Sequence, residues 1–223
     1  MTFPRTMNLT ALALLIAIPA LAEEVSPRDA IILRPDAGAE IGVIYQAWLS
    51  PLQEGGEEAD TPAFVPQAFR STAPSVNRND RLSRGHGTVA ITRDLGRAFV
   101  HVKIEGVQPE DIVMFHIHCG LPGQLGPILV DLGLGTDLPK AFADGELSVE
   151  VTNEDLVAAA EHGHGLIGVF TAGCPIVPAI PMDRVSTIAG LAQIAAEGEL
   201  YFNLHTKGQV YFGDIRGQLA KVE

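Results

Sequence analysis

Basic residues are scarce in this sequence. The 223-residue chain carries 15 lysines and arginines against 27 aspartates and glutamates, which gives a formal net charge of −12 at pH 7. Nucleic acids and anionic membrane surfaces are bound through basic side chains that neutralise phosphate groups. The composition therefore argues against both as partners, and it is typical of a domain with a solvated acidic surface.

Long apolar runs are almost absent as well. The run Leu9–Leu21 is too short and wrongly flanked for a stable membrane span. It follows a basic residue, Arg5, and ends at a small-x-small cleavage site, Ala20–Ala22, which is typical of an export signal peptide. We therefore predict a signal peptide over residues 1–22, a single mature domain over residues 23–223, no membrane span, and a location in the periplasm or outside the cell.

Cysteine occurs only twice, as Cys119 and Cys174, so one intramolecular pairing is available. In an oxidising compartment the two residues could form a bridge, which would stabilise the fold by roughly 4 kcal/mol in the chain-entropy model. The alternative is a pair of buried thiols, because Cys119 falls on the apolar face of its predicted strand. The sequence leaves both readings open.

Signatures of nucleophilic catalysis are missing. The chain has no Gly-x-Ser-x-Gly, no His-Glu-x-x-His and no phosphate-binding loop. Its carboxylates are numerous but scattered, so no paired acid and base can be identified from spacing. The sequence gives no support to hydrolase chemistry, and it leaves open whether the protein is an enzyme.

Alternation of apolar and polar residues is the dominant pattern in the rest of the chain. It predicts half-buried strands, as do short apolar runs between turn residues. The predicted strands lie at residues 41–49, 87–92, 98–105, 113–119, 127–132, 147–151, 200–206 and 208–222, with a possible earlier one at 30–33. Capping residues predict short helices from Thr152 to Gly163 and from Ser186 to Glu197. The fold class is therefore mainly β, an antiparallel sandwich or barrel with short helical insertions.

Two stretches interrupt this pattern. Residues 51–84 are rich in acidic residues, glycine and proline, and residues 163–185 contain three prolines and Cys174. Such composition is typical of loops. We predict two insertions into one domain, near 51–84 and near 163–185.

The strand Val113–Cys119, followed by the glycine-rich run Gly120–Gly126, carries two histidines on one face. His116 and His118 are two residues apart, so both side chains point the same way from Cα atoms about 7 Å apart. Two imidazoles placed in this way can reach one metal ion. Met114 lies on the same face of the strand.

A second alternating strand, Leu200–Thr206, places His205 on its polar side. Three neutral imidazoles, from His116, His118 and His205, suit copper or zinc, and Met114 would add a soft donor that copper(I) accepts. The alternative is that these histidines hydrogen-bond across the sheet or to loop carbonyls. His101, on the polar face of another strand, is either a further ligand or second-shell partner, or an ordinary half-exposed histidine.

Two motifs give the chain a specific resemblance. The first is His116-Ile117-His118 followed by Gly120, Gly123 and Gly126-Pro127, and the second is Gly198-x-Leu200-Tyr201-x-Asn203-x-His205-Thr206 leading to Asp214-Ile215-Arg216-Gly217-Gln218-Leu219. In this order they resemble the CHRD domain family, named for chordin, over Val43 to Val222. The departures are the two insertions and Asp214, where the family usually carries Glu. The resemblance implies an extracellular Greek-key β-sandwich that acts as a non-catalytic binding or structural module, with an unidentified protein or other extracellular ligand as its partner.

The same histidines also resemble those of copper/zinc superoxide dismutase in their order along the chain. That resemblance implies copper held by His116, His118 and His205, with Arg216 guiding an anion to it, although the zinc subloop of that family is missing. The alternative function is thus a copper-binding protein or a dismutase-like redox enzyme. In a structural reading, Arg216 pairs instead with Asp214 or with a buried carboxylate across the sheet.

Overall fold

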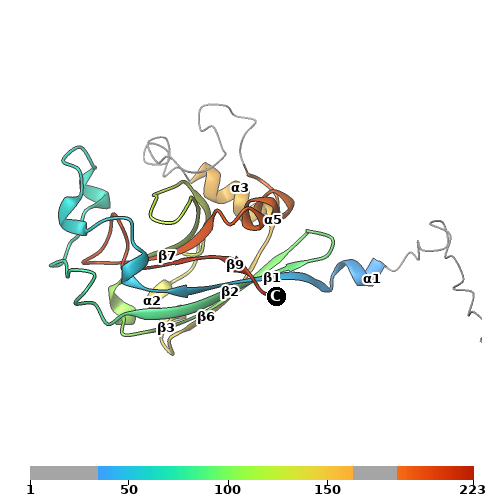
Figure 1. Cartoon of the computed structure of the whole chain (residues 1–223), viewed down its shortest axis with the longest axis horizontal. Coiled ribbons are helices and arrows are strands. Elements are labelled where there is room, and N and C mark those ends of the chain that lie inside the picture. The colour runs from blue at the N-terminus through green and yellow to red at the C-terminus, as the bar shows by residue number, and fades with distance from the viewer. Residues whose placement is uncertain (1–34, 163–184) are drawn as a thin grey trace, which may run out of the picture. The chain divides into compact units, whose positions relative to one another are not determined.

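Two antiparallel sheets form the fold, which is shown in Figure 1. The structure, a computed structural model, describes residues 35–162 and 185–223. Its strands are β1 (Ile41–Leu49), β2 (Arg84–Thr92), β3 (Ala98–Glu105), β4 (Ile112–Cys119), β5 (Ile128–Asp131), β6 (Glu146–Val151), β7 (Leu200–Thr206), β8 (Ile215–Gln218) and β9 (Ala220–Lys221). The five-stranded sheet has the order β6-β3-β2-β1-β9, and the four-stranded sheet has the order β5-β4-β7-β8.

The chain path between these strands is a Greek key. After β4 and β5 in one sheet, the chain crosses to the other sheet for β6 and later returns to place β7 beside β4. Because the fourth strand of the motif lies next to the first, the topology matches the Greek-key definition. The predicted fold class, a mainly β antiparallel Greek-key sandwich with short helices, is confirmed.

Two regions of the sequence predictions lie outside the described residues. The predicted signal peptide and the possible strand at 30–33 belong to residues 1–34, and most of the second insertion belongs to residues 163–184. Cys174 is among the latter, so the predicted bridge to Cys119 stays a prediction. Within the part of the chain that the structure describes, no helix has the length and apolar character needed to cross a bilayer.

The longer helices, α3 (Asn153–Glu161) and α5 (Ile188–Ala196), lie side by side in Figure 1. Helix α3 begins where the sequence predicted, and its N-cap Thr152 forms a capping box with Asp155. The cap of α5 is Thr187, one residue later than predicted, and its hydroxyl accepts a hydrogen bond from the Gly190 amide. The Asn153 carboxamide accepts a hydrogen bond from the backbone N–H of Ile188, so the two helices begin next to each other.

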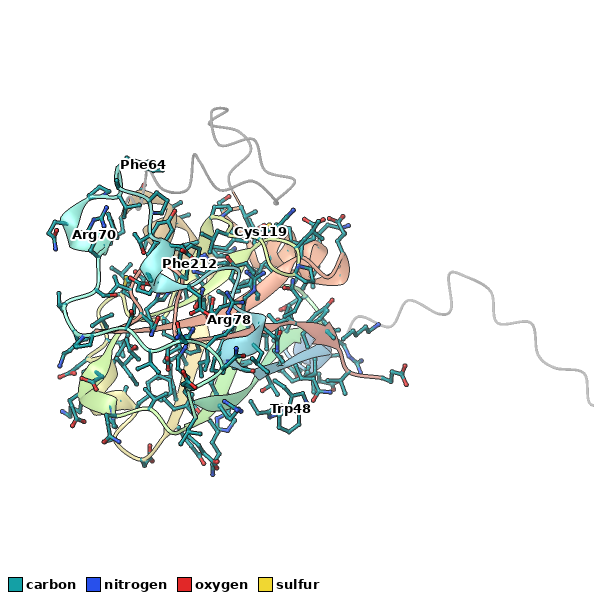
Figure 2. The ribbon with its side chains drawn as sticks, turned by 60° about the vertical axis from the view of Figure 1, so that its left-hand side comes forward. Trp48, Phe64, Arg70, Arg78, Cys119 and Phe212 are labelled. Atoms are coloured by element: carbon teal, nitrogen blue, oxygen red, sulfur yellow. The ribbon has the colours of Figure 1, made fainter. Side chains whose placement is uncertain are left out.

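Burial of the strands differs between the two sheets. In β3 the residues alternate strictly between buried and exposed, so the outer face of the five-stranded sheet meets solvent. Trp48 on β1 is 70% exposed and points away from the domain in Figure 2. In β7, by contrast, all seven residues are buried. The four-stranded sheet is therefore covered on both faces.

The side chains on the outer face of the four-stranded sheet are polar although they are buried: His116, His118, Asn203, His205 and Arg216. The inner face is apolar, with Phe115 and Ile117 of β4 fully buried in the core between the sheets. The sandwich thus has two interiors, one apolar between the sheets and one polar outside the four-stranded sheet.

The cover of this polar face is the segment of residues 51–83 between β1 and β2, called here the covering segment. It contains three short 3-10 helices, η1 (Pro51–Gln53), η2 (Glu58–Asp60) and η3 (Gln67–Phe69), where the sequence predicted a long loop or insertion. Its Glu58 carboxylate accepts hydrogen bonds from the backbone N–H groups of Tyr211 and Phe212 and from the Ser71 hydroxyl. The covering segment is therefore fixed to the chain that follows β7.

These contacts explain why the predicted strand over residues 208–222 is wrong in extent. Residues 207–214 form a loop, and only Ile215–Gln218 and Ala220–Lys221 are strands. The N–H groups of Tyr211 and Phe212 donate to Glu58 instead of to a neighbouring strand, and Gly213 adopts a φ of 103°. The backbone N–H groups of this loop are hydrogen-bonded to the covering segment, so they are not available for pairing with a neighbouring strand.

The glycine-rich loop after β4 gives a stability prediction. A Cβ added at Gly126 would overlap the carbonyl oxygen of Cys119, whereas one added at Gly123 would meet nothing within 4 Å. We expect Gly126→Ala to lower the free energy of unfolding by about 3 kcal/mol or more, because backbone must move. Gly123→Ala carries only the strain of its positive φ, about 1 kcal/mol. Urea unfolding of both variants measures the difference, and equal losses would contradict it.

Candidate metal centre

The polar outer face of the four-stranded sheet is organised by strand register. Across the sheet, Asp131 of β5 lies opposite His116, and Asn203 of β7 lies opposite the same histidine on its other side. In the neighbouring pairs, His118 faces Tyr201 and Met114 faces His205. Because side chains on one face of a sheet alternate with period two, this register brings all three predicted histidines together.

The three imidazoles converge closely enough to hold an ion. One ring nitrogen from each of His116, His118 and His205 lies within 4.8 Å of the others, and all three residues are buried. The ring centroid of His116 is 5.2 Å from that of His118 and 5.2 Å from that of His205. Three nitrogens that bind one ion tetrahedrally at about 2.0–2.1 Å each are about 3.4 Å apart, so the ring nitrogens need to approach one another by up to about 1.4 Å.

Two of the histidines are oriented by loop carbonyls. The Nδ1 of His118 lies 2.9 Å from the Gly126 carbonyl oxygen, and the Nδ1 of His205 lies 2.8 Å from the Val210 carbonyl oxygen. A carbonyl only accepts, so each Nδ1 carries the proton and each Nε2 keeps its lone pair. Hydrogen bonding to loop carbonyls, which the sequence left as the alternative to metal binding, is therefore observed for His118 and His205. It is compatible with a metal site, because ligating imidazoles usually donate their other N–H to a carbonyl or carboxylate.

The third histidine has a carboxylate beside it. The His116 Nε2 lies 3.7 Å from the Oδ1 of Asp131, and both side chains are almost completely buried. Asp131 also accepts a hydrogen bond from the Gly133 amide at 2.9 Å, which fixes the carboxylate at the end of β5. A carboxylate in this place can orient the imidazole and raise its basicity as a ligand.

A small cavity of about 60 Å³ lies against the three rings. Besides the histidines, it is lined by Phe69, Met114, Ile128, Val210 and Tyr211. The covering segment contributes Phe69, and the loop fixed by Glu58 contributes Val210 and Tyr211. A water molecule needs roughly 10–15 Å³ of such space, so the cavity has room for one ion with a few waters.

Tyr201 connects the histidines to the arginine predicted from the sequence. Its ring is stacked with His118 at a centroid distance of 5.0 Å, and the Arg216 guanidinium carbon lies 3.4 Å from the centre of the same ring. Its hydroxyl accepts a hydrogen bond from the Gly126 amide, and burial raises the pKa of Tyr201 to about 12. Gly126 therefore holds both Tyr201, through its N–H, and His118, through its carbonyl.

Arg216 serves the glycine-rich loop. It is only 1% exposed, and its guanidinium donates to the carbonyl oxygens of Gln124 at 2.6 Å and Leu121 at 2.8 Å. The buried carboxylate whose charge acts on it is Glu54 of the covering segment. Of the two kinds of partner that the structural reading offered, the buried carboxylate is thus Glu54, from the covering segment. The Asp214 carboxylate lies 3.6 Å from Arg81, which also donates to the backbone of residues 213 and 214.

His101 is not brought into the cluster. It lies on β3 in the five-stranded sheet, is exposed, and has its Nδ1 at 2.8 Å from the Ser148 hydroxyl. Among the described residues the histidine cluster consists of His116, His118 and His205 alone. Asn203, on the same face as the histidines, donates a hydrogen bond to the Phe212 carbonyl oxygen at 2.9 Å.

Three acidic residues of this region were missed by sequence reasoning. Asp131 is the last residue of an otherwise apolar strand. Only the pairing of this strand with β4, which places Asp131 opposite His116, would have indicated that it belongs to the site. Glu54 and Glu58 stand in the acidic, glycine-rich stretch where charge predicts solvation, yet both are buried. No local pattern distinguishes them from their exposed neighbours.

Glu54 gives a prediction about pH. Burial raises its pKa well above the ordinary value, against the opposing effect of Arg216 and Arg81. The folded protein therefore keeps this proton at pH values where the unfolded chain has lost it, and the contribution of Glu54 to stability falls as the pH rises above about 4.5. We expect the stability of Glu54→Gln to rise relative to that of the natural protein as the pH increases above about 4.5, because the variant has no carboxyl group that must stay protonated.

Glu57 is the matched control for this experiment. Burial raises its pKa, but the hydrogen bonds from Arg78 outweigh that effect and the net shift is downward. The contribution of Glu57 to stability is therefore present above the pKa that it has in the unfolded chain and is lost at lower pH. Relative to the natural protein, Glu57→Gln should thus become less stable as the pH rises. Urea unfolding at several pH values measures the stability of each variant relative to the natural protein. If this difference changes with pH in the same direction for Glu54→Gln and Glu57→Gln, the opposite pKa shifts assigned to the two carboxyl groups are wrong.

Comparison with known proteins identifies the family. No curated protein sequence matches the chain, and no solved structure matches it. A family model described as the CHRD domain matches residues 67–219, which begins later than the resemblance predicted from Val43. This match contains all three histidines, Asp131, Tyr201 and Arg216. Because it covers more than half of the sequence, the chain belongs to the CHRD domain family, a family of binding and structural domains.

Proposed function

We propose that this chain is an exported CHRD module that binds one transition metal ion, copper or zinc, through His116, His118 and His205, and that it does so without catalysing a reaction. One observation carries the proposal: three buried imidazoles from two adjacent strands converge within 4.8 Å. Three imidazoles that converge in this way, each oriented from its other side by a carbonyl or a carboxylate, are the typical donor set of a transition-metal site.

The chemistry of the donors supports copper or zinc. Imidazole is a ligand of intermediate softness that both metals accept, whereas calcium and magnesium prefer oxygen. Two carbonyls and the Asp131 carboxylate lie where partners of ligating histidines are usually found. The net charge of −12 also favours the approach of a cation.

Export is supported by the leader pattern over residues 1–22 and by the family. Outside the cytoplasm a histidine site meets copper and zinc without competition from the cytosolic thiol pool.

Two features weigh against the redox enzyme as the alternative. A dismutase-like role needs Arg216 to meet a diffusing anion, but Arg216 is buried and donates to the carbonyls of Gln124 and Leu121. Phe69 and Tyr211 line the cavity over the histidines and leave little space for exchange of substrate. Stable binding of the ion agrees better with this arrangement than turnover of a substrate.

Metal titration tests the proposal directly. The purified protein should bind one equivalent of zinc(II) or copper(II), and His205→Ala or the double variant His116→Ala/His118→Ala should weaken binding at least 100-fold. His101→Ala is the matched control, because it removes a histidine from the other sheet, and it should bind as the natural protein does. Calorimetric titration together with elemental analysis measures this. Equal binding by all variants, or none by the natural protein, would disprove the site.

Asp131 gives a second, finer prediction. Asp131→Asn keeps the shape of the side chain but removes the charge beside His116, so metal affinity should fall about 10- to 100-fold. Glu150→Gln, which removes one exposed charge on the five-stranded sheet, controls for the change in net charge. If the two variants bind equally well, Asp131 has no role in orienting the ligand.

A further inference from the structure

Met114 occupies a special place beside the histidines. It is on the same face of β4 as His116 and lies directly opposite His205 of β7. It lines the cavity of about 60 Å³ together with the three histidines. The remaining lining residues are the hydrocarbon side chains of Phe69, Ile128 and Val210, and Tyr211. Met114 is thus the one side chain there that brings a soft, neutral donor.

Met114 also belongs to a second cavity. A hollow of about 310 Å³ is lined by Met114 and Asp131 together with residues of the chain after β5 and with His162 at the end of α3. Several of its lining residues, among them Asp137 and His162, are exposed. Met114 is the residue that the two cavities have in common, so its side chain separates the buried histidines from the outer cavity.

We propose that Met114 is a fourth ligand of the metal site and makes it selective for copper(I) over zinc(II). This inference rests on the proposed function, because it assigns the metal and a further donor at the same three histidines. A thioether sulfur is a soft donor that copper(I) accepts, whereas zinc sites are built from imidazole, thiolate and carboxylate ligands. Met114 therefore adds binding energy for copper(I) and little for zinc(II).

The outer cavity gives the ion a route to this donor. A cation there meets the Asp131 and Asp137 carboxylates first, and Met114 stands between it and the histidines. Methionine has three rotatable bonds and a polarisable sulfur, so it can move while it remains bound to the ion. Met114 thus has two roles: it is a ligand of the ion, and its side chain can change rotamer to admit the ion from the outer cavity.

The test compares affinities for the two metals. Copper(I) affinity is measured under anaerobic, reducing conditions by competition with a chromophoric copper(I) chelator, and zinc(II) affinity by competition with a zinc indicator. Met114→Leu keeps a side chain of similar volume, an exchange that cores tolerate. We expect it to lower the ratio of copper(I) to zinc(II) affinity at least tenfold. Val157→Leu, at an exposed position of α3 that lines neither cavity, should keep the natural ratio.

The outcomes separate this inference from the proposed function. If the natural protein and Met114→Leu both bind the metals with the same affinity ratio, Met114 is not a ligand, while the three-histidine site stands. If the natural protein binds neither metal, both fail. Should Met114→Leu fold poorly, X-ray absorption of the copper(I)-loaded natural protein decides: a sulfur neighbour of the copper supports the proposal, and nitrogen neighbours alone overturn it.

Discussion

The burial of a polar sheet face is the constraint on which the rest of this structure depends. Imidazole, carboxamide and guanidinium groups lose their hydration on the outer face of the four-stranded sheet, and each must find a partner there. The partners come from backbone carbonyls of two loops: the glycine-rich loop for Arg216 and His118, and the loop after β7 for His205 and Asn203. The covering segment closes over them and holds the last of these loops through Glu58.

Much of the fold could be predicted from local pattern. The strands β3 and β4 follow from strict alternation, and the start of α3 from the N-cap candidate Thr152. Alternation also placed His116 and His118 on one face. It could not show that this face is covered, because a polar face with period two is the same in sequence whether water or protein lies against it. The cover comes from residues 51–83, whose acidic and glycine-rich composition is typical of solvated loops.

The three candidate metal ligands could be predicted from the sequence, but the residues that contact them and Arg216 could not. The order of motifs along the chain placed His205 with the other two histidines through family resemblance, and the register of β4 with β7 brings them together. The place of Tyr201 depends on that same register and the place of Asp131 on the register of β4 with β5, and no single strand specifies either. Of the alternatives expected for Arg216, Asp214 lies against Arg81 of the covering segment, and the buried carboxylate near Arg216 is Glu54 of the same segment. When a side chain's partner lies on a segment far away in the sequence, the residues next to it in the sequence do not reveal that partner.

The position of Glu58 has a consequence for how this protein can change over evolution. Its carboxylate holds the backbone of Tyr211 and Phe212, next to the Val210 carbonyl that orients His205. Substitutions at positions 58 and 205 should therefore be strongly epistatic, although the residues are 147 positions apart in the sequence (205 − 58). Homologues that lose the acidic residue at this point are expected to have replaced the whole loop after β7, and with it the geometry of the third histidine.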